Sequence, residues 1–314
     1  MLDEKGSRPF AKDNFCAIYY FMEIRSEETH AYRILAPDDW CSSVIFASPH
    51  SGRAYEDAFL AETILDPLTL RSSEDAYVDQ LIGDVAAWGC PLICAQAPRA
   101  YVDLNRAADE MDPAVVDGVI KRGSNPRIAS GLGVIPRVVS HGRCIYRGKL
   151  TLAEAQRRIE VLWRPYHNVM SKCMQASMDR FGRAILIDLH SMPHEAVASF
   201  SKSHRPPEIV VGDRYGTSAD PDITQFVVAC FERAGFRVAL NTPFAGAYIL
   251  QQYGKPSQQH HALQIEIDRS LYLDAKRLQP SPDFTQCKAK LRRALHDIAQ
   301  WAKAIDSDHP LAAE

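Results

Sequence analysis

Short apolar runs recur along the 314-residue chain, and each stops abruptly at polar or helix-breaking residues. The runs are rich in Val, Ile and Leu and are too short for most helices, which is typical of strands covered on both faces. On this basis we predict strands at residues 43–47, 91–95, 184–189, 208–211, 236–240 and 262–267.

Between these runs, apolar positions recur at the spacing of amphipathic helices. The helices that we predict cover 75–88, a long segment from residue 151 onward, 222–234 and 283–305. Thr151 and Glu154 form a capping box, and Pro165 should kink the long helix that they open. Gly235 is a candidate C-cap.

Strands that alternate with helices predict an α/β fold with a mixed, mostly parallel sheet sandwiched by helices. We expect a single catalytic domain over residues 1–314, with a core at about 40–275 and a C-terminal helix at 283–305. In such folds, ligands bind at the carboxyl ends of the strands.

Charge and hydropathy exclude several classes of partner. The formal net charge is only -3, which argues against a nucleic-acid footprint or a polybasic membrane patch. No apolar run is long enough to span a bilayer. The first ten residues are charged and lack the apolar core of a signal peptide, so we expect a cytoplasmic protein with a small-molecule partner.

Two histidines stand at the ends of two predicted strands: His50 follows 43–47, and His190 follows 184–189. A neutral imidazole is a common zinc ligand, and catalytic zinc usually takes three protein ligands and water. We therefore favour a shared metal ion over two unrelated, hydrogen-bonded histidines.

Acidic residues supply the other candidate groups. Asp75 is favoured as the third metal ligand with Glu74 as the alternate, although both could simply complement a helix dipole. Glu266 lies in an apolar strand, where a carboxylate is costly unless it is paired or functional. It could serve as general base near a metal ion or form a salt bridge with Arg269 or another arginine, and the residues leave both roles open.

Other residues are candidates for binding the anionic groups of a ligand. Asn105 and Arg106 offer an amide and a planar guanidinium, which suit a polarised acyl oxygen and a carboxylate. Arg137 and Arg214 lie among glycines and are further candidates for anion contacts. Several arginines near a metal site suit a small dianionic substrate.

Seven segments of the chain resemble the N-formylglutamate amidohydrolase family and occur in its order. They are PHSGR at 49–53, EDAYVD at 74–79, PRAYVDLNR at 98–106, residues 131–138, IDLHSMP at 187–193, GDR at 212–214 and residues 261–269. The resemblance covers roughly residues 45–275.

That family is similar to zinc carboxypeptidases and related deacylases, so the resemblance implies a zinc-exopeptidase type of fold and a zinc or other divalent cofactor. It also implies that His190 is a ligand, that Asn105 and Arg106 contact the substrate, and that Glu266 is the general base. Arg53 stands where the HxxE motif of carboxypeptidases has its glutamate. Either the acidic ligand therefore comes from Asp75 or Glu74, or the site binds metal differently.

The activity that this resemblance implies is hydrolysis of N-formyl-L-glutamate to formate and L-glutamate, a step of histidine degradation in the family. The two substrate carboxylates would be held by arginines among Arg106, Arg137, Arg214 and Arg269. The alternatives are a deacylase of other N-acyl amino acids, a short-peptide carboxypeptidase and a non-catalytic small-molecule-binding protein on the same scaffold. The oligomeric state is not indicated.

Overall fold

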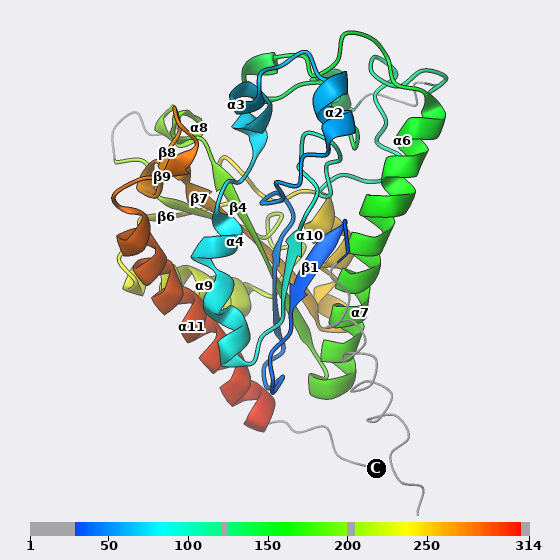
Figure 1. The fold of residues 1–314 in the computed structure, drawn as a ribbon. Coiled ribbons are helices and arrows are strands. Elements are labelled where there is room, and N and C mark those ends of the chain that lie inside the picture. Colours follow the sequence, from blue (N-terminus) through cyan, green and yellow to red (C-terminus); the bar gives the residue numbers. More distant parts are fainter. Residues whose placement is uncertain (1–28, 121–124, 200–204, 309–314) are drawn as a thin grey trace, which may run out of the picture.

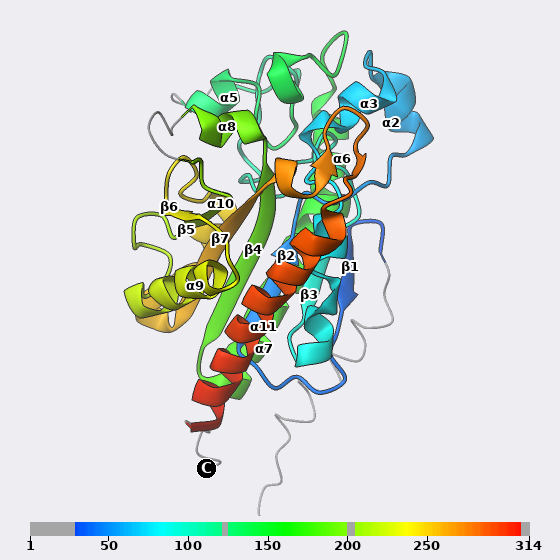
Figure 2. The same ribbon diagram turned by 90° about the vertical axis from the view of Figure 1, so that its left-hand side faces the viewer.

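A seven-stranded sheet forms the centre of the computed structural model, which describes residues 29–120, 125–199 and 205–308. Its strands are β1 (Tyr32–Leu35), β2 (Val44–Ser48), β3 (Leu92–Ala95), β4 (Ala184–Met192), β5 (Ile209–Gly212), β6 (Val238–Leu240) and β7 (His260–Asp268). Their spatial order is β1-β3-β2-β4-β7-β5-β6, as the labels of Figure 2 show. A separate hairpin pairs β8 (Leu273–Asp274) with β9 (Gln279–Pro280).

The sheet is mixed and mostly parallel, as predicted. Strands β3, β2, β4 and β7 run parallel to one another, whereas β1 and the parallel pair β5–β6 run antiparallel to them. The carboxyl ends of β2, β4 and β7 therefore meet at one edge of the sheet, where the α/β rule places ligands.

Helices pack on both faces of this sheet, and further short helices lie beyond its carboxyl edge (Figures 1 and 2). They are α2 (Asp57–Glu62), α3 (Pro67–Leu70), α4 (Val78–Leu81), α5 (Pro126–Ala129), α6 (Leu152–Arg158), α7 (Arg164–Phe181), α8 (His194–Ala198), α9 (Pro221–Arg233), α10 (Tyr248–Tyr253) and α11 (Phe284–Asp308). Shorter turns are η1 (Arg71–Ser73), η2 (Gly83–Trp88), η3 (Ser140–Gly142), η5 (Pro256–Gln258) and η6 (Arg269–Leu271), and η4 (Ile159–Trp163) is a π-helical turn.

Two apolar layers separate the sheet from its helices. One contains α6, α7 and α10, and the other contains α4, α9 and α11, on opposite sides of the sheet in both views (Figures 1 and 2). Alternate residues of β2 divide between them: Ile45 and Ala47 face the α7 layer, while Val44 and Phe46 face the α11 layer. This period of two is the signature of a strand buried on both faces.

The α7 face of the sheet changes from apolar to polar along β4 and β7. Leu186 of β4 and Ala262 of β7 belong to the α7 layer, but the next residues with the same orientation are polar: Asp188 and His190 in β4, Gln264 and Glu266 in β7. All four side chains are buried. The sheet therefore builds its own polar pocket floor where the apolar layer ends.

Most predicted elements agree with the structure, and the differences have local causes. All six predicted strands are present, but β4 runs on to Met192, so His190 lies within the strand rather than after it. The edge strand β1 was not predicted, because its four residues include Arg33 and bury only alternate positions.

The predicted helix at 75–88 is wrong as a continuous element. Tyr77 adopts a left-handed backbone conformation with φ of 63°, and only α4 and η2 form after it. Glu74 and Asp75 therefore lie between η1 and α4, and the acidic residue in the first turn of α4 is Asp79, so the helix-dipole explanation for Glu74 and Asp75 fails.

The capping interaction at Thr151 is present, since its side chain accepts a hydrogen bond from the Glu154 amide. The long helix contains a π-helical turn, η4, which ends two residues before Pro165, and the kink at Pro165 stays a prediction. No helix in the described ranges is both long and apolar enough to cross a bilayer. The first ten residues, on which the signal-peptide argument rests, lie outside these ranges.

Candidate active site

Three buried side chains from separate segments converge at the carboxyl ends of β2 and β4. The Nδ1 atoms of His50 and His190 lie 3.1 Å apart, and Asp75 Oδ2 lies 3.5 Å and 3.1 Å from them, respectively. These donors form a group that could hold a metal ion. The Asp75 amide also donates to the His50 carbonyl at 3.0 Å, which ties the two segments together through the backbone.

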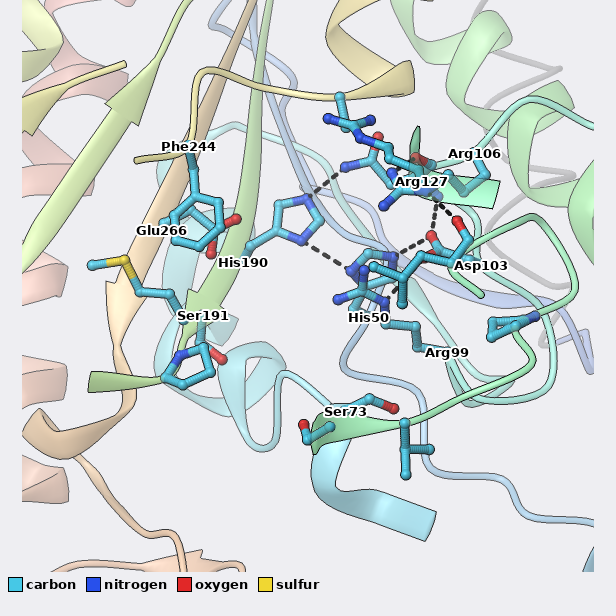
Figure 3. A pocket seen from close by; sticks show the side chains of 18 of the residues that line it. His50, Ser73, Arg99, Asp103, Arg106, Arg127, His190, Ser191, Phe244 and Glu266 are labelled. Atoms are coloured by element: carbon cyan, nitrogen blue, oxygen red, sulfur yellow. Dashed lines mark hydrogen bonds and ion pairs between the residues drawn. The ribbon is translucent and has the colours of Figure 1, made fainter. Parts of the chain in front are cut away.

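A second layer of carboxylates fixes both imidazoles. His50 Nε2 lies 2.8 Å from Asp103 Oδ1 (Figure 3). His190 Nε2 lies 2.8 Å from Asp188 Oδ2. If each Nε2–H donates to its carboxylate, both Nδ1 lone pairs face the shared point with Asp75. A histidine ligand that donates its other ring N–H to a carboxylate is the common arrangement at metal sites.

The size and the charge of this group fit a divalent ion. Tetrahedral ligands at zinc distances of about 2.0–2.1 Å are separated by about 3.3 Å, close to the separations observed here. Burial acts to lower the pKa of His190, but Asp188 and Asp75 overcome it and hold that pKa well above its usual value. The point between the donors therefore favours positive charge.

Of the two acidic candidates, Asp75 joins the donor group and Glu74 does not. Glu74 instead accepts hydrogen bonds from Nε and Nη2 of Arg71, at 2.9 and 3.2 Å. The other Asp75 oxygen accepts from Ser191 Oγ at 3.2 Å and from Arg269 at 3.0 Å. Arg53, at the HxxE glutamate position, binds Asp79 through both terminal nitrogens.

Glu266 lies beside this group, because it is paired in register with His190 across β4 and β7. It is 8% exposed and accepts a hydrogen bond from Gln264 Nε2 at 2.9 Å. Burial raises its pKa to about 7, against the lowering effect of His190. The guanidinium of Arg269 is used by Ser191, Ser72 and Asp75, so the salt bridge with Glu266 that the sequence left open does not form.

The segment with Asn105 and Arg106 is held from several sides. Ile249 N donates to Asn105 Oδ1 at 2.8 Å, which leaves the Asn105 amide nitrogen 3.3 Å from His190 Nε2. From the helix behind, Trp163 Nε1 donates to the Arg106 carbonyl and His167 Nε2 contacts the Leu104 carbonyl, both at 2.9 Å. Trp163 lies in the π-helical turn, a feature frequently found at functional sites.

The predicted arginines divide into two groups. Arg106 and Arg269 line the cavity of about 520 Å³ next to the donor group, but Arg137 and Arg214 do not. The Arg137 guanidinium instead binds Asp112 and the Ala129 carbonyl. Arg214 takes a left-handed backbone conformation, and its amide donates to Ala245 O.

The GDR segment, residues 212–214, supports the wall of the cavity. Asp213 Oδ1 accepts from Asn241 Nδ2 at 2.7 Å, and Asn241 Oδ1 accepts from the Asp213 amide at 3.0 Å. A side chain at Gly212 would place its Cβ 2.7 Å from the Ala245 carbonyl carbon. These contacts hold the loop that carries Pro243 to Ala247, which lines the cavity.

Several residues of the site were not assigned a role from sequence. Asp188 could have been found, because it lies two residues before His190 and so shares its face of the strand. Asp103 lies within the PRAYVDLNR motif, but only the fold shows that it contacts His50. Arg99 and Arg127 also line the cavity.

The site thus combines two imidazoles that each contact a carboxylate, a third acidic donor, and a buried glutamate, all beside a cavity. This combination is typical of metal-dependent hydrolases.

Comparison with known proteins identifies the family. The model of the N-formylglutamate amidohydrolase family matches residues 42–273. The N-formylglutamate deformylases of Pseudomonas putida and Pseudomonas aeruginosa are each 26% identical to this chain, over 241 and 266 residues, which is 74% and 83% of this chain and 82% and 94% of the relatives. The solved N-formylglutamate amidohydrolase from Ralstonia eutropha JMP134 is 33% identical with a TM-score of 0.82, covering 88% of this chain and 99% of that one. The chain belongs to the N-formylglutamate amidohydrolase family, and its class is that of amide-bond hydrolases.

Proposed function

We propose that this enzyme hydrolyses N-formyl-L-glutamate to formate and L-glutamate, with a zinc ion held by His50, Asp75 and His190. The observation that supports this most directly is the juxtaposition of the three donors with Glu266 across the β4–β7 pair. The names of its relatives support the same substrate.

The donor set of two imidazoles and one carboxylate suits zinc. A divalent ion there would polarise the formyl carbonyl and lower the pKa of a water molecule. Asp103 and Asp188 keep both Nδ1 atoms free to coordinate, and Arg269 holds Asp75 in the orientation that presents its second oxygen.

Glu266 serves as general base and then as general acid. It accepts a proton from the attacking water as the oxygen bonds to the formyl carbon, and it returns that proton to the nitrogen as the C–N bond breaks. A pKa of about 7 suits both directions of transfer near neutral pH. The Asn105 amide is oriented by Ile249 N and is available to donate to the oxygen that gains charge.

Formate release tests this proposal. Purified enzyme is loaded with zinc and given N-formyl-, N-acetyl- or N-succinyl-L-glutamate, and L-glutamate release is measured for all three substrates, together with formate release from the formyl compound. We expect formate release that is lost after chelation and restored by zinc, with one zinc per chain by elemental analysis. Hydrolysis of only the acetyl or succinyl compound would refute the substrate, and full activity in metal-free protein would refute the metal.

A further inference from the structure

The arginines that line the cavity differ in whether a carboxylate neutralises them. Arg99 donates to Asp103 at 3.0 Å, and Arg269 donates to Asp75 at 3.0 Å. Arg106 and Arg127 also line the cavity, but neither has a carboxylate partner among the residues that the structure describes. The cavity wall therefore carries two uncompensated positive charges.

Arg106 is the inner of these two. Its side chain is 6% exposed, and its guanidinium donates to the carbonyl oxygens of Leu132 and Asn105 at 2.9 and 2.8 Å. Burial, together with repulsion from Arg99 and Arg127, lowers its pKa against the opposite effect of Asp103. A buried guanidinium bonded only to neutral groups is costly unless an anion joins it.

Arg127 is the outer cation and is exposed. Its backbone is nevertheless fixed: its amide donates to Asn125 Oδ1 at 2.9 Å, and its carbonyl accepts from Leu132 N at 2.9 Å. Leu132 thus links the Arg127 backbone with the Arg106 guanidinium. Figure 3 shows the two arginines together, across His190 from Glu266 and Phe244.

Glu110, a second carboxylate that acts to raise the pKa of Arg106, is already engaged. Glu110 accepts from the Ala107 amide at 3.2 Å through one oxygen and from Asn125 Nδ2 at 3.2 Å through the other. It therefore supports the loop that carries Arg127 and does not bind either guanidinium.

We propose that Arg127 binds the side-chain carboxylate of the substrate and so makes the enzyme selective for an acidic N-acyl amino acid. This inference rests on the proposed function. The α-carboxylate is attached next to the scissile amide and so falls to the inner Arg106, beside Asn105. The side-chain carboxylate extends farther from the reacting carbon and reaches the outer cation. Two substrate charges then match two unpaired arginines.

A pair of substrates tests this assignment. N-formyl-L-glutamine differs from N-formyl-L-glutamate only in a neutral amide for the side-chain carboxylate. In Arg127→Gln we expect kcat/KM for N-formyl-L-glutamate to fall about 10- to 100-fold, mainly through KM, while N-formyl-L-glutamine is hydrolysed as by wild type. The control Arg147→Gln removes the same charge from an exposed loop position that does not line the cavity, and neither substrate should respond.

An equal loss on both substrates, or no loss on either, would overturn the assignment. If wild-type enzyme releases formate from neither compound, the proposed function fails separately. The subsite is then judged by calorimetric binding of glutarate, a dicarboxylate without an amide, to zinc-loaded protein. Binding that weakens in Arg127→Gln but not in Arg147→Gln supports the subsite, and equal binding by all three proteins refutes it.

Discussion

Replacing Asp188 by Asn should weaken metal binding without touching a metal ligand. The Asp188 side chain is fully buried, and its Oδ2 lies 2.8 Å from His190 Nε2. An asparagine oxygen can still accept this N–H, but the negative charge that makes the imidazole a stronger ligand is lost. Asp188 Oδ1 has no hydrogen-bond partner in the described structure, so the new amide group would also be buried unsatisfied.

The expected loss can be placed within a known range. Removing such a second-layer partner typically costs 10- to 100-fold in metal affinity. Because the hydrogen bond to His190 can persist while the buried negative charge is lost, we expect the zinc affinity to fall about 30-fold, or about 2 kcal/mol. Competition with a chromophoric chelator measures it, at a pH of about 8.5 so that protons compete little with the metal.

The matched control is Asp112→Asn, which also neutralises a buried, ion-paired aspartate. Asp112 binds Arg137 and the Ala114 amide and does not contact the donor group. Its zinc dissociation constant should equal that of wild type. A natively folded Asp188→Asn protein with unchanged zinc affinity would refute the role given to Asp188.

Three further predictions concern catalysis and stability. Glu266→Gln should keep its zinc by elemental analysis while kcat falls by about 10²- to 10⁴-fold, and near-normal turnover would rule out Glu266 as the base. Burial lowers the pKa of His167 to about 4, below the unfolded value of 6.5. The unfolded chain thus binds a proton that the native state excludes, and stability is lost as pH falls from 6.5 towards 4. Between pH 7 and pH 5 this costs about 2 kcal/mol, and urea titrations of His167→Gln should show a shallower pH dependence than wild type. Arg158 is fully buried and bonds Glu154, Glu62 and Tyr146, so Arg158→Met should lower the unfolding free energy by about 2–4 kcal/mol in the same titration; an unchanged midpoint and slope would contradict this.

The sequence predicted the parts of the fold that follow from local pattern. The buried strands were visible because both their faces are apolar. His50, His190 and Glu266 were visible because polar residues end or interrupt apolar runs there, whereas Asp75 was chosen as one of two carboxylates at a predicted helix start. The failed helix at 75–88 shows the limit of this reasoning. The apolar residues of this segment have helical spacing, but Tyr77, with its left-handed backbone, separates the helical part from Asp75. No residue type in the segment predicts that turn.

The sequence could not show which arginines pair with a carboxylate of the protein, because residue type and neighbouring glycines do not reveal a tertiary partner. Arg137 looked suited to a substrate anion, yet it binds Asp112, which lies 25 residues away. Arg127 follows the proline that opens the short helix α5, and it has no carboxylate partner among the described residues. Whether an arginine is neutralised by the protein or left for a ligand depends on contacts that only the folded chain makes.

The register between β4 and β7 determines which side chains meet in the site, and the apolar layers specify that register. His190 pairs with Glu266 while Ile265 and Ile267 face the opposite, α11 layer. A slip of β7 by one residue would bury Glu266 among apolar side chains and turn isoleucines into the cavity. The burial that stabilises the sheet therefore also fixes the glutamate beside the metal donors, so stability and catalytic geometry select the same pairing.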